Sequence, residues 1–177
     1  YLQCPSVVKV NLVGKKAKWA SAKDVILYIL QQLSVKGGVN KIIEYSGEGL
    51  KELSLTDRAT ICNMGAELGA TTSVFPTDEI TKEYLIQQGR EEDYVELKAD
   101  EDATYDEEIT VDLSKLVPLT AKPHSPDAVV PVSELRGMKI NQVVIGSCTN
   151  SSLPDMLKAA KILKGRRVAT HVSLVIA

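Results

Sequence analysis

The C-terminal part of the chain constrains the fold most, because it reads as two strands joined through a helix. Residues 142–145 are largely apolar and β-branched, and a Gly-Ser-Cys corner follows them. The helical spacing of apolar residues predicts a helix from about Leu153 to Lys164, and Gly165 ends it. Residues 168–176 form a second apolar strand. Because two strands joined through one helix lie parallel, the sequence predicts an α/β fold with parallel or mixed sheets.

Strands and helices also alternate in the first 118 residues, where we expect a complete α/β domain. The sequence predicts strands at residues 8–12, 41–45, 71–75 and 109–113, helices at about 55–69 and 78–88, and a helix ending near residue 34 that Ser21 or Asp24 caps. Ser54 and Asp57 have the spacing of a capping box at the start of the second helix. Residues 90–108 are acidic and are expected to be irregular.

A cluster of prolines separates this region from the C-terminal one. Four prolines lie within residues 118–131. Because proline lacks a backbone donor and restricts φ, we expect residues 119–131 to form an extended connection that is not part of a core. Residues 132–177 then belong to a second, partial α/β domain.

The composition excludes several classes of protein. With 44% hydrophobic residues and a formal net charge of -2, the chain is too apolar to be disordered and too balanced to coat nucleic acid. No run of about 20 apolar residues is present, so we expect no membrane span. Three widely spaced cysteines, Cys4, Cys62 and Cys148, form no disulfide framework and indicate a reducing, cytoplasmic setting. With only His124 and His171 besides them, the chain alone lacks a complete metal-ligand set.

The first candidate site is a polar pair on the second predicted helix. Asn63 and Glu67 are four residues apart and share one face of a helix. Ile61, Met64 and Leu68 form a different, apolar face. The glycines and alanines around the pair allow a ligand or another backbone to approach closely. The pair points either into a cleft or into solvent, and the spacing alone leaves both interpretations open.

The second candidate site is Cys148, which lies where an apolar strand meets a helix. Ligands of open α/β sheets bind at the carboxyl ends of strands. Backbone N–H groups at the start of a helix stabilise an anion, so a cysteine there favours the thiolate, which is a nucleophile or a metal ligand. The alternative is a small buried cysteine among polar capping residues.

Two long stretches resemble the aconitase family. Residues 58–76 (RATICNMGAELGATTSVFP) are similar to the aconitase signature, and residues 145–151 (IGSCTNS) are similar to the family's first cluster-binding signature. Residues 35–38 (VKGG) and 43–47 (IEYSG) also resemble the family, in the right order. The resemblance covers nearly the whole chain. It implies a three-layer αβα fold, in which the two predicted domains are the second domain and the opening of the third.

The resemblance also implies a cofactor and roles for the site residues. Aconitases hold a [4Fe–4S] cluster with three cysteines, and one iron without a thiolate binds the substrate as a Lewis acid. By resemblance, Cys148 is the first cluster ligand, Asn63 hydrogen-bonds near the cluster, and Glu67 bonds to water or hydroxide on the open iron. The family's other two cysteines, its substrate-binding arginines and its catalytic serine have no counterpart in this sequence. We therefore expect an internal fragment that needs the enzyme's remaining domains and is inactive and cluster-free alone.

The family contains several activities, and the resemblance favours an aconitate hydratase, which isomerises citrate and isocitrate through cis-aconitate. Residues 70–76 (ATTSVFP) look most like that enzyme. One alternative is the large subunit of isopropylmalate or homoaconitate dehydratase, which residues 162–166 (ILKGR) resemble. Another is an RNA-binding regulatory relative, which residues 57–60 (DRAT) resemble, although the net charge of -2 argues against a nucleic-acid partner. A third is an enzyme with Cys148 as a simple nucleophile.

Overall fold

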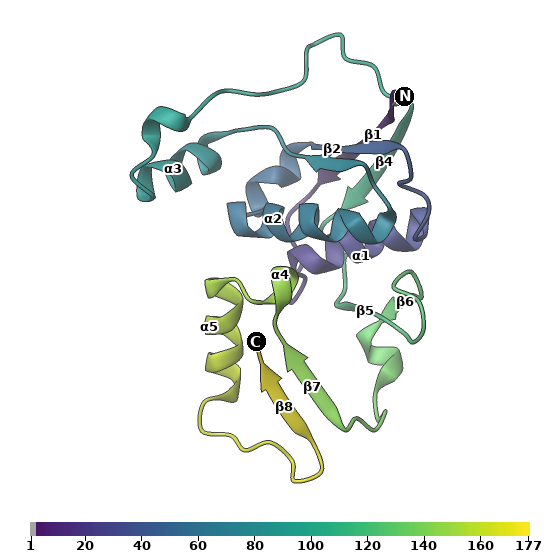
Figure 1. Ribbon diagram of the computed structural model, residues 1–177, viewed down its shortest axis with the longest axis vertical. Coiled ribbons are helices and arrows are strands. Elements are labelled where there is room, and N and C mark those ends of the chain that lie inside the picture. The colour runs from purple at the N-terminus through teal and green to yellow at the C-terminus, as the bar shows by residue number, and fades with distance from the viewer. Residues whose placement is uncertain (1–2) are drawn as a thin grey trace. The chain divides into compact units, whose positions relative to one another are not determined.

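The computed structural model describes residues 3–177 and divides into two compact units, Tyr1–Pro131 and Val132–Ala177 (Figure 1). The division falls just after the proline-rich segment. Within residues 3–177, none of the helices combines the length and the apolar character needed to cross a membrane. Each unit is described by itself below.

The first unit is built around a sheet of four parallel strands. They are β1 (Ser6–Val13), β2 (Lys41–Ser46), β3 (Thr72–Val74) and β4 (Glu107–Asp112). Their spatial order is β3-β2-β1-β4, so the chain steps outward from β1 on one side and returns to its other side with β4. Val10 of β1 lies opposite Tyr45 of β2 and Ile109 of β4. The predicted α/β class with a parallel sheet is confirmed, and it is consistent with the three-layer αβα fold.

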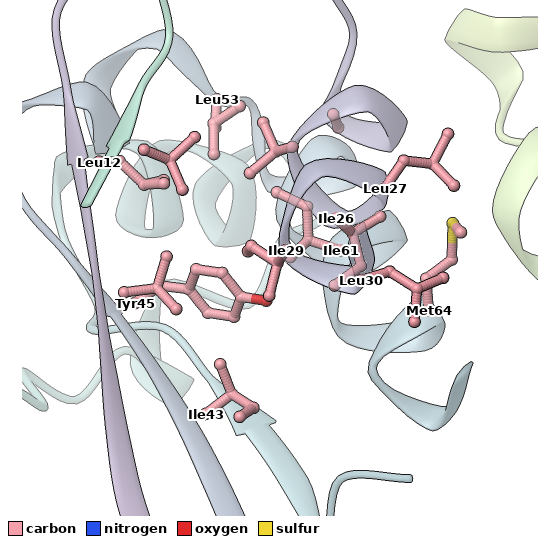
Figure 2. Packing of buried hydrophobic residues seen from close by; sticks show 14 of the residues in the cluster. Leu12, Ile26, Leu27, Ile29, Leu30, Ile43, Tyr45, Leu53, Ile61 and Met64 are labelled. Atoms are coloured by element: carbon pink, nitrogen blue, oxygen red, sulfur yellow. The ribbon is translucent and has the colours of Figure 1, made fainter. Parts of the chain in front are cut away.

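Two helices pack on the apolar face of this sheet, α1 (Ala22–Leu33) and α2 (Leu55–Met64). Along β1 every second residue is buried, namely Val8, Val10 and Leu12, because side chains of a strand alternate between its two faces. Figure 2 shows the strand side chains facing Ile26 and Ile29 of α1. Fully burying an aliphatic side chain of this size contributes about 1.5–3 kcal/mol, so this cluster is the main source of stability of the unit.

The second helix begins as predicted but ends earlier. The Ser54 hydroxyl accepts a hydrogen bond from the Asp57 N–H at 3.2 Å, and the Asp57 carboxylate accepts one from the Ser54 N–H at 3.1 Å. The sequence predicts one helix to residue 69, whereas α2 ends at Met64 and continues as the 3-10 helix η2 (Gly65–Leu68). The change comes where β3 approaches: a Cβ on Gly65 would lie 2.5 Å from the Ser73 hydroxyl.

The remaining helical elements of this unit are short. They are the 3-10 helix η1 (Glu48–Glu52), the helix α3 (Glu79–Gln87) and the 3-10 helix η3 (Glu91–Asp93). The segment between η3 and β4 has no regular structure, as the sequence predicts for this acidic stretch.

The proline-rich segment differs from the extended connection that the sequence predicts. It forms an antiparallel hairpin of β5 (Leu119–Ala121) and β6 (Val129–Pro131), which belongs to the first unit. The Asp24 carboxylate of α1 accepts a hydrogen bond from the Leu119 N–H at 2.6 Å, and the Gln31 amide donates to the Val129 carbonyl at 3.0 Å. Val129 is buried in the core. The prolines are compatible with this structure because a two-stranded hairpin has free edges at which no N–H is needed.

The second unit contains the predicted strand–helix–strand arrangement. Its elements are η4 (Val132–Leu135), β7 (Gln142–Ile145), α4 (Ser147–Asn150), α5 (Leu153–Leu163) and β8 (Ser173–Ile176). β7 and β8 are parallel, which confirms the prediction for this region. The last strand is shorter than the predicted 168–176, because a turn closed by the Val172 N–H and the Ala169 carbonyl precedes it.

Candidate active site

The polar pair predicted on the second helix lies where α2 passes into η2. Asn63 is in the last turn of α2, and Glu67 is in η2. Both residues are exposed, whereas Ile61, Met64 and Leu68 are buried in the core. The two polar side chains therefore lie on the solvent side of the segment.

A small cavity of about 260 Å³ lies beside Asn63. Its lining is formed by Cys62, Asn63, Gly65, Ala66, Ala70, Thr71, Thr72 and Ser73. Asn63 belongs to the lining and Glu67 does not, so the structure brings only one member of the pair into this hollow. The small side chains leave it open to a compact polar group.

In the wall of the cavity, Cys62 joins α2 to β3. Its thiol donates a hydrogen bond to the Ser73 carbonyl at 3.6 Å. Burial raises the pKa of the Cys62 thiol, which therefore stays protonated at neutral pH and is a poor nucleophile. The nearby Tyr45 ring is fully buried and stacks on Phe75 with 4.3 Å between centroids. Burial, above all, raises the pKa of Tyr45 as well, so both groups are neutral components of the packing.

A buried arginine holds the other end of α2. Arg58 is 2% exposed, and its guanidinium donates to both carboxylate oxygens of Asp78, at 3.0 and 2.6 Å. It also donates to the Leu50 carbonyl at 3.1 Å and lies over the Phe75 ring. Burial alone would raise the pKa of Asp78, but hydrogen bonds from Arg58 and Thr81 outweigh it and lower that pKa. The pair is therefore ionised and bidentate at neutral pH.

The predicted cluster ligand, Cys148, lies in the second unit. It is exposed within the four-residue helix α4 that follows β7. A Cβ on Gly146 would lie 2.7 Å from the Ala177 carbonyl oxygen, so only glycine fits this corner. Ser147 has φ of 73°, an uncommon conformation for a residue other than glycine. The exposed thiol of Cys148 thus follows a backbone corner whose conformation is tightly constrained.

The residues present fit one ligand of a metal cluster and not a complete site. An exposed cysteine thiol after a strand is chemically suited to bind iron, and Cys148 meets this requirement. Within residues 3–177, no three histidine, cysteine or acidic side chains gather where they could hold a metal ion.

Sequence reasoning missed the Arg58–Asp78 pair. Arg58 is at helical spacing with the buried Ile61 and with Gly65, which places a charged residue on the apolar side of α2. That position was the available signal, because a charge on an apolar face needs a partner. Its partner, 20 residues further along the chain, could not be identified from spacing.

Comparison with known proteins identifies a family and several relatives that this chain resembles. It matches the aconitase family (aconitate hydratase) over residues 1–137 and 133–177. It is 44% identical over 176 residues to a protein named 3-isopropylmalate dehydratase large subunit 2 from Archaeoglobus fulgidus, covering 99% of this chain and 42% of the relative. For the protein of that name from Rubrobacter xylanophilus the identity is 43% over 174 residues, covering 98% and 41%. For the 3-isopropylmalate dehydratase large subunit of Clostridium kluyveri it is 44% over 176 residues, covering 99% and 42%.

The chain thus spans about two-fifths of the length of the curated relatives it matches. The match to the family extends over both units of the structure and includes both candidate sites. The chain belongs to the aconitase family.

Proposed function

We propose that the whole protein is a hydro-lyase that acts as the large subunit of a 3-isopropylmalate dehydratase. The observation that carries this proposal is an identity of 43–44% over nearly the whole chain to three proteins of that name. These relatives support the large-subunit alternative better than the aconitate hydratase that the sequence motifs favour. Because a large subunit implies a second chain, we also propose a small-subunit partner.

A second candidate activity, aconitate hydratase, is favoured by one segment. Residues 70–76 (ATTSVFP) resemble the aconitate hydratase version of the family signature. This segment begins in the lining of the cavity beside Asn63 and continues through β3 to Pro76. A difference there could alter which substrate fits, so the two activities require a direct comparison.

For either activity, Cys148, Asn63 and Glu67 would have separate roles in the reaction. Cys148 would provide one thiolate ligand for a [4Fe–4S] cluster, which supplies Lewis acidity toward the substrate hydroxyl when it is bound. The Asn63 side chain offers an amide donor at the cavity, suited to a sulfur or carboxylate oxygen. The exposed Glu67 carboxylate is suited to accept a hydrogen bond from the leaving hydroxyl or from water. The resemblance to the aconitase family supports these roles, and the exposure of the Asn63, Glu67 and Cys148 side chains is compatible with them.

Activity of the whole protein distinguishes the candidates. After anaerobic reconstitution with iron and sulfide, the protein is assayed with 3-isopropylmalate and with citrate, each with and without the small subunit. We expect turnover of 3-isopropylmalate only when both subunits are present. Turnover of citrate by the single chain would instead establish aconitate hydratase, and inactivity on both substrates would refute the proposal.

Two variants test the assigned residues. Glu67→Gln removes the carboxylate charge and should lower kcat by about 100-fold or more, as loss of an acid–base group does. The matched control is Glu79→Gln, which alters another exposed glutamate of the same unit, in α3, and should leave kcat unchanged. Equal effects of both changes would contradict a specific role for Glu67.

A further inference from the structure

The ion pair between the buried Arg58 and the half-buried Asp78 joins α2 to the segment that follows β3. Arg58 lies in the first half of α2, and Asp78 follows β3 and precedes α3. The guanidinium binds both oxygens of Asp78 and also the Leu50 carbonyl. Because a guanidinium is a rigid planar fork, three acceptors held at once fix its position in all directions. The pair therefore determines where the first half of α2 lies against the segment that leads from β3 to α3.

The far end of α2 contacts β3 itself, at its middle residue Ser73. The Cys62 thiol donates to the Ser73 carbonyl, and Gly65 packs against the Ser73 hydroxyl. Arg58 and Gly65 are seven residues apart, which is about 10 Å along a helix. Two contacts at this separation set both the register and the rotation of the helix on the strand, whereas one contact would leave a pivot.

The candidate site residues are placed between and just beyond these two contacts. Asn63 lies between them in sequence, and Glu67 follows Gly65 by two residues. A change in register or rotation at Arg58 would move Asn63 with α2, and it would also displace Glu67, because η2 follows α2 directly in the chain.

We propose that Arg58 is a positioning residue, whose bidentate contact with Asp78 sets the register of α2 on β3 and thereby holds Asn63 and Glu67 for the reaction. This inference rests on the proposed hydro-lyase function. It assigns Arg58 no contact with the substrate, since the guanidinium is buried beneath the helix.

The test uses Arg58→Lys in the whole protein, with Arg90→Lys as the control. Lysine keeps the charge but cannot bind both carboxylate oxygens and the carbonyl in one plane. The control alters an exposed arginine that binds Asp93 at 2.6 Å in the same unit. Two properties are measured: the kinetic constants, and the alkylation rate of Cys62, resolved by mass spectrometry from the rates of the exposed Cys4 and Cys148.

For Arg58→Lys we expect kcat to fall about 10- to 100-fold with KM nearly unchanged, since small misplacements of catalytic groups have effects of this size. Cys62 should alkylate faster because its contact with Ser73 loosens, and Arg90→Lys should change neither property. An unchanged kcat, or an unchanged Cys62 rate, would overturn the inference even if the melting temperature fell. If the wild type has no activity, the proposed function fails and the Cys62 rate alone decides whether Arg58 sets the register. If Arg58→Lys does not fold, Asp78→Asn is tested against the same criteria.

Discussion

The two units use the same strand–helix–strand arrangement, but they differ greatly in how far the apolar side chains of the helix are buried. In the first unit, β1 and β2 flank α1 in sequence, and most apolar residues of α1 are buried, with Val25, Ile29 and Leu30 fully so. In the second unit, β7 and β8 flank α5, yet Leu153 is 73% exposed and Ile162 is 61% exposed. Within the described part of the chain, every buried hydrophobic side chain lies in the first unit.

The difference shows what an amphipathic pattern does and does not determine. Both helices have an apolar face, and the helical spacing of their apolar residues correctly predicts where each helix lies in the sequence. Burial also requires enough sheet to cover that face, and β1 has a partner strand on each side whereas β7 pairs with β8. An apolar groove of about 340 Å³ remains between α5 and its two strands. The second unit therefore gains little stability from its own hydrophobic residues.

A large loss of unfolding free energy is expected when a leucine of the first unit is truncated, and a small one when a leucine of the second unit is. Leu30→Ala removes a fully buried side chain from the core of the first unit and should lower the free energy of unfolding by about 2–5 kcal/mol. Leu157→Ala, in the half-exposed position on α5, should change it by no more than about 0.5 kcal/mol. Urea denaturation of the chain measures both. Similar losses in the two variants would mean that α5 packs as tightly as α1, contrary to the comparison.

A charged pair in each unit provides the second test. Asp78→Ala leaves the buried Arg58 without its carboxylate and should cost about 3–5 kcal/mol. Lys158→Ala in the second unit breaks a contact of 3.7 Å between the exposed Lys158 and the half-buried Asp155, which should cost at most about 1 kcal/mol. Thermal unfolding with and without added salt measures the difference. A loss for Lys158→Ala as large as that for Asp78→Ala would refute the distinction between a pair with a buried cation and one with an exposed cation.

The successes and failures of the sequence predictions follow the range of the interactions involved. The capping box of Ser54 and Asp57 was predictable because both partners lie within one turn of the chain. The end of α2 at Met64 was not, because it depends on Ser73 packing against Gly65. The proline-rich hairpin was missed for the same reason, since its anchor Asp24 is 95 residues away from Leu119. Contacts between distant segments leave no periodic signal.

The candidate site likewise has features that the local sequence predicts and features that depend on distant segments. The exposed positions of Asn63 and Glu67 agree with the local helical pattern, whereas the cavity beside Asn63 depends on β3 and its preceding turn. The roles of Asn63, Glu67 and Cys148 come from family resemblance, and they stay predictions until variants are measured. Arg58 could be suspected from its place on an apolar face, but only the fold shows its partner.

A smaller effect is expected from removing matched helix caps. Ser54 caps α2 and Ser152 caps α5, and each hydroxyl accepts a hydrogen bond from an aspartate N–H three residues later. Ser54→Ala should lower the global free energy of unfolding by about 1 kcal/mol, because α2 unfolds together with the core. Ser152→Ala should reduce helicity locally and leave the main transition unchanged. Hydrogen exchange resolves the two cases, and a loss of protection in β1 caused by Ser152→Ala would contradict the independence of the units.

The smallest expected effect concerns the stability of the protein at acidic pH, to which a carboxylate of the first unit should contribute. Hydrogen bonds from the Ser114 hydroxyl, Lys115 and the Ser114 N–H lower the pKa of Asp112 to about 2. Since the ordinary pKa of aspartate is about 3.9, the unfolded chain binds more protons than the folded chain between these values. The contribution of Asp112 is therefore complete above about pH 4 and is lost as the pH falls toward about 2.

Asp112→Asn should remove this part of the acid dependence, so that the unfolding midpoint in urea changes less between pH 5 and pH 2.5 than it does in the wild type. The matched change in the second unit is Asp155→Asn, at the start of α5, which should leave the pH dependence of the main transition as it is. The two variants carry the same change in charge, so a difference between them separates the effect of the Asp112 hydrogen bonds from that of losing a carboxylate. An acid dependence that responds equally to both changes would show that the hydrogen bonds of Asp112 in the first unit are not its source.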